Sequence, residues 1–580
     1  MVKNNKNENK IIKTNKIIKN NFISATSIKN FILNDPLIDW LKYYKINDIT
    51  DAPDINRLQN KYEDKFLSYI LTEGIKFEKY IIEQLALKFD IVTVCNENDY
   101  TNFNKFEETK QLLLKGIPII YQGLLYNYKN NTYGIPDLLI RSDYINKIYE
   151  NTIPLNEELI NGKFYYFVVD IKGSTINLDS TGINVLNSNN LSFYKSQLLI
   201  YTLAVSEILN ITINKAFILG KRYIWTNNNN KNIATDPFLK LGTIDYENKD
   251  FKYYNLIEKG LVWLNDVKED GHNWHILPTP SRKELYPNMK NSRYNNYSLV
   301  KNQLAYEIKE LTSIWYVNYK NRNFAHSNNI YSWTDKKCNS TTLGINNKRG
   351  IIIDNILNVN RDSDKIIYPL QIKYNENNWK QYNNNTMEFY IDYETTNYEN
   401  RTYIFMIGVG YIDNGWKFKN FTMPLLDDET QELVLKDFWI FINNLLLKCN
   451  KTEPRFIHWT KAEPSNYNKY IDKFKLPNMN FIDLYDVFVK EPITIKGALN
   501  FSLKEISKAM YNLKLIQTTW QTDISCMNGL DTLYWSLILY KTGRRIRKTN
   551  KYLNDIIKYN EIDCKVLYEI ITYLRNNHIL

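Results

Sequence analysis

The sequence predicts an α/β protein with more than one domain. Its 580 residues exceed what a single hydrophobic core usually organises. In the first half, amphipathic segments with helical periodicity alternate with short β-rich runs. Near the end, three successive β-rich runs precede an alternation of helix and strand. An apolar fraction of 44% is ordinary for a globular protein.

The chain is predicted to consist of four segments. Residues 1–21 are rich in Lys and Asn, which indicates a disordered tail. Residues 22–268 are predicted to form the first α/β domain, and residues 269–385 a mainly helical connecting region with a helix over 299–319. Residues 386–580 are predicted to form the second α/β domain.

Each α/β domain has its own order of elements. In the first, helical periodicity covers 28–44, 56–89 and 192–209, and β-rich runs cover 134–140, 164–171, 216–225 and 241–246. In the second, β-rich runs cover 389–392, 403–412, 417–423 and 455–459, and helices are predicted over 429–447 and 551–574. The first three strands of the second domain follow one another closely, so they are predicted to form an antiparallel meander.

Composition narrows the classes of function. Lys and Arg number 74 against 63 Asp and Glu, a net charge of +11, which favours an anionic polymer such as nucleic acid as a partner. The five cysteines lie far apart without a CxxC pair, so no zinc or iron–sulfur site is expected: Cys95, Cys338, Cys449, Cys526 and Cys564. With only five histidines in the chain, any catalysis should depend on carboxylates.

No targeting or membrane segment is evident. No apolar run approaches the roughly 20 residues of a membrane span. The first residues lack the short apolar core of a signal peptide. We therefore expect an intracellular, soluble protein with no membrane partner, whereas its compartment and oligomeric state are not indicated.

The first candidate site lies on two β-rich runs of the first domain. Asp137 follows Gly-Ile-Pro at the start of one run, and Asp170 and Lys172 end another. Two carboxylates at the ends of adjacent strands can bind a hard cation such as Mg²⁺. Lys172 lies two residues after Asp170 and so faces the same side of its strand, where it can orient water or stabilise the pentacovalent phosphate. Similar Asp-x-Lys triplets at 250–252 and 266–268 show that the triplet alone is common.

Two helices supply further candidates. Gln197 and Tyr201 are four residues apart on the helix that follows Asp170, so they share one helical face and can contact substrate or support the site. Glu78 lies on the upstream helix and can add an oxygen ligand.

This ordered set resembles the RecB-type nuclease domain of the PD-(D/E)XK superfamily. The resemblance implies a restriction-endonuclease-like α/β core with Glu78, Asp137 and Asp170 as metal ligands. It also implies Lys172 as the catalytic lysine and Gln197 with Tyr201 as the QxxxY element. The alternative for each residue is a structural one, namely a turn, strand-end or surface-helix polar group.

The second candidate site begins the second α/β domain. Asp392 and Glu394 lie two residues apart on an apolar strand and so face the same way. Tyr559 and Asp563 lie one turn apart on the predicted final helix. Three or four carboxylates around two magnesium ions, with a phenol to align water, suffice to remove nucleotides by in-line displacement. A second Asp-Tyr-Glu triplet at 245–247 has no later pair to complete it.

This second set resembles the DnaQ-like DEDD exonucleases, and more narrowly the ribonuclease H-like domain fused behind RecB-type nuclease domains. Segments 481–485, 502–504 and 528–531 also match that fused family. The middle motif departs from the family, because Trp459 stands where Asn is common and Glu463 where Asp is common. Asp483 is an alternative ligand, although a structural role for it is favoured, and His458 is favoured as a packed residue rather than a base.

Together the motifs predict a metal-dependent nuclease that uses Mg²⁺ (or Mn²⁺) and acts on DNA and/or RNA in replication, repair or recombination. DNA is favoured as the substrate and an exonuclease as the mode, and the motifs leave both choices open. The alternative is a nucleic-acid-binding or scaffolding protein in which the C-terminal site or both sites have degenerated. No GxxxxGK[ST] phosphate loop occurs in the sequence, so any helicase partner would be a separate chain.

Overall fold

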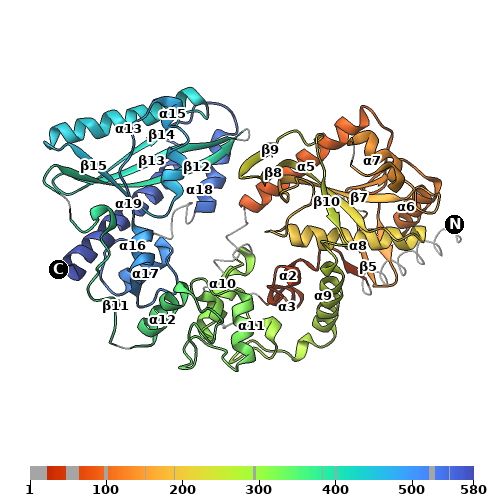
Figure 1. Ribbon diagram of the computed structural model, residues 1–580, viewed down its shortest axis with the longest axis horizontal. Helices are drawn as coiled ribbons and strands as arrows, with labels where there is room; N and C mark the ends of the chain where they lie inside the picture. The colour runs from red at the N-terminus through yellow and green to blue at the C-terminus, as the bar shows by residue number, and fades with distance from the viewer. Residues whose placement is uncertain are drawn as a thin grey trace, which may run out of the picture. The chain divides into compact units, whose positions relative to one another are not determined.

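The computed structural model describes residues 22–46, 65–96, 99, 102–150, 152–188, 190–291, 295–362, 364–381, 383–398, 401–520, 529–547 and 549–579. They form an α/β protein with two compact units, Met1–Ile308 and Lys309–Leu580, each with mixed β-sheets and packed helices (Figure 1). The division falls inside the 269–385 segment, so this segment contributes to both units. The predicted tail, 1–21, lies outside the described residues.

The first unit is built around a mixed sheet with the strand order β10–β8–β7–β6–β3–β2, in which β9 also pairs with β8. β3, β6 and β7 pair antiparallel in succession, whereas β7 and β8 pair parallel. A smaller sheet has the order β1–β5–β4. The strands of this unit are β1 (Ile23–Ser24), β2 (Ile91–Thr93), β3 (Ile119–Tyr121), β4 (Leu125–Asn127), β5 (Thr132–Gly134), β6 (Leu138–Arg141), β7 (Tyr166–Asn177), β8 (Lys215–Asn227), β9 (Asn230–Ala234) and β10 (Gly242–Asp245).

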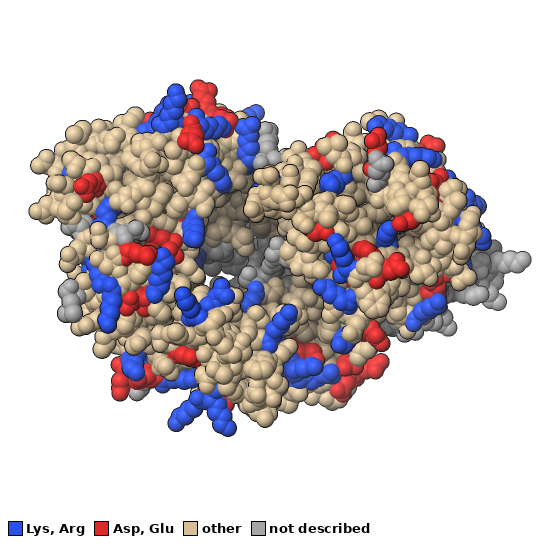
Figure 2. All heavy atoms as spheres, in the orientation of Figure 1, with Lys and Arg blue, Asp and Glu red and all other residues tan. Residues whose placement is uncertain are grey.

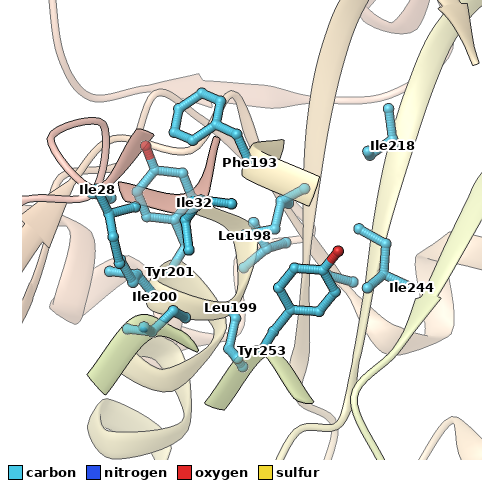
Figure 3. Close-up of a cluster of buried hydrophobic side chains, with 14 of the residues drawn as sticks. Ile28, Ile32, Phe193, Leu198, Leu199, Ile200, Tyr201, Ile218, Ile244 and Tyr253 are labelled. Atoms are coloured by element: carbon cyan, nitrogen blue, oxygen red, sulfur yellow. The ribbon is translucent and has the colours of Figure 1, made fainter. Parts of the chain in front are cut away.

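Helix α8 makes the crossover that a parallel pair such as β7–β8 requires. Most of its side chains are buried, and Figure 3 shows Leu198, Leu199 and Tyr201 of this helix among core side chains. The helices of this unit are α2 (Lys29–Ile32), α3 (Leu37–Tyr43), α5 (Lys65–Ala86), α6 (Phe103–Lys115), α7 (Ser142–Ile148), α8 (Leu191–Leu209), α9 (Lys252–Glu269) and α10 (Asn295–Glu307).

Several predicted elements of the first unit differ from the observed ones, and proline explains two of the differences. The single helix expected over 28–44 is divided into α2 and α3, because Pro36 precedes α3 and cannot continue the ladder of α2. The strand expected over 134–140 is likewise two strands, β5 and β6, separated by Ile135, Pro136 and Asp137. The helix expected over 299–319 ends with α10 at Glu307. Residues 56–64 of another expected helix lie outside the described residues.

The second unit is built around a sheet with the strand order β14–β13–β12–β15–β16. The predicted antiparallel meander is confirmed, since β12 pairs with β13 and β13 with β14 in that sense. β15 pairs parallel with both β12 and β16. The strands of this unit are β11 (Ile367–Tyr368), β12 (Thr386–Tyr398), β13 (Arg401–Ile412), β14 (Trp416–Thr422), β15 (Glu453–His458), β16 (Phe481–Asp483) and β17 (Thr494–Ile495).

Two hydrophobic clusters cover the sheet of the second unit, one including α13 residues and the other residues of α16, α17 and α19. Helices α18 and α19 both pack on β12. The helices of this unit are α11 (Tyr319–Ser327), α12 (Lys348–Arg361), α13 (Asp428–Lys448), α14 (Ala462–Tyr467), α15 (Ile471–Phe474), α16 (Leu484–Lys490), α17 (Leu503–Asn512), α18 (Gly529–Tyr540) and α19 (Lys551–His578). No helix in the described parts of the chain is long and apolar enough to cross a membrane.

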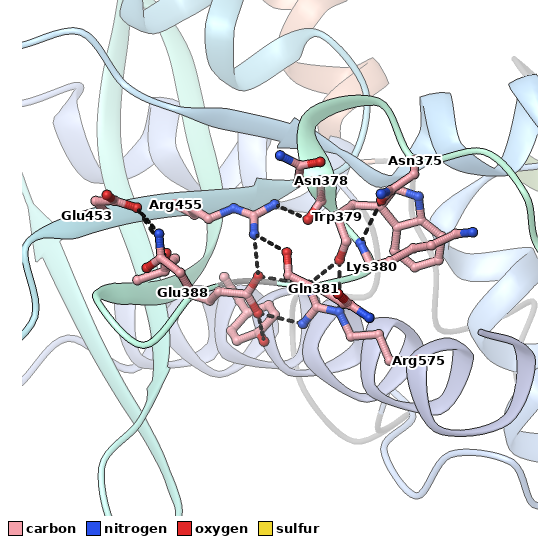
Figure 4. Close-up of polar contacts among 12 residues, drawn as sticks. Asn375, Asn378, Trp379, Lys380, Gln381, Glu388, Glu453, Arg455 and Arg575 are labelled. Atoms are coloured by element: carbon pink, nitrogen blue, oxygen red, sulfur yellow. Dashed lines mark hydrogen bonds and ion pairs between the residues drawn. The ribbon is translucent and has the colours of Figure 1, made fainter. Parts of the chain in front are cut away.

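A buried ion-pair group fixes α19 against the start of β12 (Figure 4). Arg575 of α19 donates two hydrogen bonds to the Glu388 carboxylate, of 2.7 and 2.8 Å. Arg455 of β15 lies 3.9 Å from the same carboxylate. Two arginines compensate the buried charge of Glu388, so the strand and the helix that supply the second candidate site are held together.

Candidate metal-binding sites

The β6–β7 pair brings the first two predicted carboxylates together. Asp137 directly precedes β6, and Asp170 follows Val169, which pairs with Leu138. The backbone N–H of Ile171 donates a 2.6 Å hydrogen bond to Asp137 Oδ2, so the Asp137 side chain reaches β7 beside Asp170. Burial raises the pKa of Asp137 well above its ordinary value, and the Asp170 carboxylate raises it further.

Lys172 is the positive charge of this group. Its ammonium forms an ion pair with Asp170 Oδ2, two residues earlier on the same side of β7. The ammonium also lies 4.9 Å from the centre of the Tyr194 ring. Burial lowers the pKa of Lys172, but the Asp170 and Asp137 carboxylates outweigh burial and raise it above its ordinary value. The lysine therefore stays charged beside two acids.

The strand that carries Asp170 does not end there, contrary to the sequence prediction. β7 continues to Asn177, with an irregular register on β8 between Lys172 and Thr175. Backbone pairing with β8 extends the strand beyond the apolar run that predicted it. A Cβ on Gly173 would lie 3.3 Å from Gly74 Cα, so α5 passes close over this strand.

Helix α5 places Glu78 beside the same group. Glu78 Oε1 accepts a 2.8 Å hydrogen bond from Tyr121 Oη and a 3.1 Å hydrogen bond from Gln122 Nε2. After burial and Asp170, the charge of Glu78 is among the causes that raise the pKa of Asp137. Sequence reasoning missed Tyr121 and Gln122, although two polar residues that end the apolar run of β3 were a usable signal.

Gln197 and Tyr201 are buried behind the candidate site and do not line an open surface. Both side chains are buried on α8, and Gln197 Nε2 donates a 2.9 Å hydrogen bond to Tyr201 Oη. A Cβ on Gly134 would overlap the Tyr201 ring, so this glycine of β5 leaves the space the ring occupies. Burial, followed by the Asp170 charge, raises the pKa of Tyr201, so its hydroxyl keeps its proton.

The second candidate site brings three predicted acids into one group. Asp392 and Glu394 of β12 and Asp563 of α19 each offer an oxygen, and these oxygens lie within 4.8 Å of one another. Across the described ranges of the chain, no other set of three His, Cys, Asp or Glu side chains meets this spacing. Asp137, Asp170 and Glu78 of the first site are neighbours but do not form such a set.

Burial and mutual repulsion favour the neutral forms of these acids when no cation is bound. Burial raises the pKa of Glu394 to about 8, with Asp563 adding to the shift. Burial raises the pKa of Asp563 to about 7, although the nearby Lys504 ammonium opposes the shift. Burial, then Asp563, raises the pKa of Asp392 well above its ordinary value. Three buried carboxylates this close together are stable in their charged forms only when a positive charge lies beside them.

The donor set suits a hard divalent cation. All three groups offer carboxylate oxygens, which Mg²⁺ and Mn²⁺ prefer. Glu394 Oε1 is buried and has no hydrogen-bond partner among the described residues, which is costly for a polar atom unless an ion satisfies it. The residues of this site therefore fit the predicted metal.

Asn560, which sequence reasoning missed, holds Asp392 in place. Its Nδ2 donates a 2.7 Å hydrogen bond to Asp392 Oδ2 and a 3.2 Å hydrogen bond to the Asp392 carbonyl oxygen. Gly408 of β13 pairs with Asp392 across the sheet, and a Cβ there would overlap Asn560 Oδ1. The lack of a side chain at Gly408 therefore leaves room for the Asn560 amide. The only available signal was a polar residue on the buried face of the final helix, one position after Tyr559.

The remaining predicted residues lie near the three acids in different roles. Tyr559 is on α19, one turn before Asp563, and burial followed by the Asp563 charge raises its pKa. The Lys504 ammonium lies 4.8 Å from the centre of the Tyr559 ring. Glu463, on α14, is buried and is among the groups that raise the pKa of Asp392, after burial, Asp563 and Glu394.

The departures in the middle motif have a structural account. Glu463 Oε2 lies 3.3 Å from His458 Nδ1, so this histidine is a buried neighbour of the acid. Trp459 packs in the core and donates a 3.2 Å hydrogen bond to the Phe501 carbonyl. Asp483 caps α16 by accepting from Tyr485 N at 2.9 Å, so it has the structural role that the sequence favoured.

Comparison with known proteins gives no relative: no protein-family model matches this chain, and no curated protein matches it.

Proposed function

We propose that this chain is a metal-dependent nuclease that hydrolyses phosphodiester bonds of DNA and/or RNA with Mg²⁺ or Mn²⁺. The observation that carries this proposal is the convergence of Asp392, Glu394 and Asp563, whose oxygens lie within 4.8 Å of one another. A net charge of +11 is consistent with a polyanionic substrate.

The topology of the second unit supports a ribonuclease H-like fold for it. An antiparallel meander, β12 to β14, is followed by parallel pairing of β12 with β15 and of β15 with β16. The acids lie on the central strand β12 and on a helix that packs against it. This arrangement is the one that the DEDD resemblance leads us to expect.

The first unit supports a RecB-like PD-(D/E)XK nuclease domain in a similar way. Asp137 directly precedes β6 and Asp170 lies on the neighbouring strand β7. Lys172 faces the same side as Asp170, and α5 brings Glu78 to Asp137. Gln197 and Tyr201 lie behind this group on the crossover helix.

At the second site, Asp392, Glu394 and Asp563 would hold the cation, which when bound offsets phosphate charge and lowers the pKa of an attacking water. Asn560 keeps the Asp392 carboxylate fixed through its 2.7 Å hydrogen bond. Tyr559 retains its proton at neutral pH because its pKa is raised by burial and by Asp563. Its hydroxyl can therefore donate a hydrogen bond that orients the water or the phosphate.

At the first site, Asp137, Asp170 and Glu78 would hold the cation. Lys172 is charged and paired with Asp170, so a phosphate that enters meets a fixed ammonium. Tyr201 and Gln197 lie behind these residues, and a 2.9 Å hydrogen bond joins their side chains.

The test is cleavage of labelled single- and double-stranded DNA and RNA with Mg²⁺ or Mn²⁺ and with EDTA. Lys172→Ala and Asp392→Asn separate the two sites. The chain offers matched controls in its duplicate triplets, namely Lys268→Ala at 266–268 and Asp245→Asn at 245–247. We expect metal-dependent cleavage by the wild type and the controls, and its loss in the variant of the active site.

An outcome without cleavage of any substrate would contradict the nuclease proposal. Retained nucleic-acid binding would then favour the alternative, a binding or scaffolding protein with degenerate sites.

A further inference from the structure

A basic segment joins the two helices that flank the second site. Residues 541–551, with the sequence KTGRRIRKTNK, contain six Lys or Arg and no Asp or Glu. Lys541, Arg544, Arg545, Arg547 and Lys551 are all exposed. Three of the chain's fourteen arginines lie between positions 544 and 547. Arginine is the better phosphate ligand, because its planar guanidinium can donate two parallel hydrogen bonds where an ammonium acts as a point charge.

Several surface cations of the second unit have an acidic partner. Arg401 and Lys473 both pair with Asp428, and Lys448 pairs with Asp413. Arg544, Arg545 and Arg547, by contrast, form no ion pair with any residue that the structure describes. Figure 2 shows Lys and Arg scattered among Asp and Glu on the visible face, so net charge alone does not mark a binding surface. The segment is distinguished by three arginines within four residues that have no ion pair with a described residue.

Hydrogen bonds hold described residues within and beside this segment. Ile546 N donates a 3.0 Å hydrogen bond to the Pro424 carbonyl, which ties the middle of the segment to the end of the meander. Tyr540 Oη, at the end of α18, donates a 2.6 Å hydrogen bond to the Met423 carbonyl. Asn550 caps α19 by accepting from Tyr552 N at 2.9 Å. The backbone between Arg545 and Arg547 is therefore held at Ile546.

The segment leads to the three acids. It joins α18 to α19, and both helices pack on β12, the strand of Asp392 and Glu394. Asp563 lies twelve residues after Lys551 on α19, which is about 18 Å along the helix axis. That length corresponds to about five phosphates of one strand.

We infer that Arg544, Arg545 and Arg547 bind the phosphate backbone of the nucleic acid strand whose end reaches Asp392, Glu394 and Asp563. The inference rests on the proposed function and adds the surface that recognises the substrate. Contacts to phosphate oxygens carry no sequence information, so binding through these phosphate contacts should be independent of sequence.

The test measures binding apart from cleavage. A labelled oligonucleotide is titrated in EDTA against the full chain and against the triple variant Arg544→Gln/Arg545→Gln/Arg547→Gln. A control variant with the same loss of charge is Lys336→Gln/Lys337→Gln/Lys348→Gln, because these exposed lysines lie in the same unit outside the segment. Circular dichroism and melting temperature establish that all variants are folded.

We expect the arginine variant to bind at least about tenfold more weakly at low salt, with the log–log salt slope reduced by about 2 to 3. The control should bind within about twofold of the wild type with a nearly unchanged slope. Equal losses in both variants, or no loss in the arginine variant, would overturn the inference.

Two further outcomes keep this inference distinct from the nuclease proposal. If the wild type binds the oligonucleotide through the arginines but never cleaves it with Mg²⁺ or Mn²⁺, the surface stands and the nuclease proposal fails. If the wild type cleaves but the arginine variant binds normally, the nuclease stands and the surface fails. Equally tight arginine-dependent binding of polyglutamate would instead assign the surface to an acidic protein partner.

Discussion

The two candidate sites balance their negative charge in different ways. In the first unit, Lys172 forms an ion pair with Asp170, so part of the charge is balanced by a cation that the chain itself supplies. In the second unit, the three acids face one another within 4.8 Å, and burial raises the pKa of Glu394 to about 8. Without a metal, the second site is thus balanced by protons. Similar carboxylates can therefore depend on pH to different degrees.

The two sites also share a structural feature, a strand glycine that leaves space for a helix side chain. In each, a glycine on a strand leaves space for a polar side chain from the helix behind it, Gly134 for Tyr201 and Gly408 for Asn560. The helix side chain then lies next to a strand acid, and in the second site it donates directly to Asp392. Close approach of helix and strand, rather than the acids alone, sets the geometry of both sites.

The largest expected effect separates the sites by activity. Asp563→Asn removes one of three clustered ligands, so any cleavage at the second site should fall by about a thousandfold or more. Cleavage that depends on Lys172 should remain. Steady-state rates on a labelled oligonucleotide, with Lys172→Ala as the complementary variant, measure both. A decrease of less than tenfold in the Lys172→Ala background would show that the three acids do not form a catalytic site.

The second effect is on stability against pH. Since the pKa of Glu394 is raised to about 8 and that of Asp563 to about 7, the folded, metal-free chain binds more protons than the unfolded chain between about pH 4 and 8. The stability that these protons contribute is full below that window, falls as the pH rises through it, and is lost above about pH 8. We expect a loss of about 1 kcal/mol per pH unit in its upper part.

Melting temperatures in EDTA from pH 5 to 9 measure this loss. Glu394→Gln should flatten the profile, and Mg²⁺ should restore stability at pH 8 because cation binding replaces the lost protons. An equally steep fall of melting temperature with pH in Glu394→Gln would contradict the view that protons balance the charge of this site.

The third expected effect is a loss of stability when either strand glycine is replaced. Gly408→Ala and Gly134→Ala each place a methyl where a buried side chain lies, so each should destabilise its unit by about 1 to 3 kcal/mol. Gly529→Ala is a suitable control, because a Cβ there meets nothing within 4 Å. Urea unfolding monitored by fluorescence measures all three. Losses no greater than that of the control would show that neither glycine is needed for space.

The smallest effect concerns Asn560. Asn560→Ala leaves Asp392 without its 2.7 Å hydrogen bond, so Mn²⁺ affinity at the second site should fall about tenfold. Because Asn560 is not a ligand, the number of ions bound should not change, whereas Asp563→Asn should reduce it. Calorimetric titration gives both quantities. An unchanged affinity would make Asn560 a packing residue only.

Local patterns predicted much of the fold. The meander of the second unit was predicted from three apolar runs in succession, and pairing of β12, β13 and β14 confirms it. Prediction was wrong where tertiary pairing outweighed polarity, as in the extension of β7 beyond Lys172. It was also wrong where Pro36 divided an amphipathic run into α2 and α3.

The sequence by itself determined which acids could act together, because the two-residue spacing of Asp392 and Glu394 orients both carboxylates before any tertiary contact forms. Only the tertiary structure decided that Asp563 joins them and that Asn560 holds Asp392. The reason is that these contacts cross 168 or more residues of chain, and their distances depend on how α19 packs against β12 and β13. Spacing along a strand is a covalent property, whereas convergence of a strand and a distant helix is a result of packing.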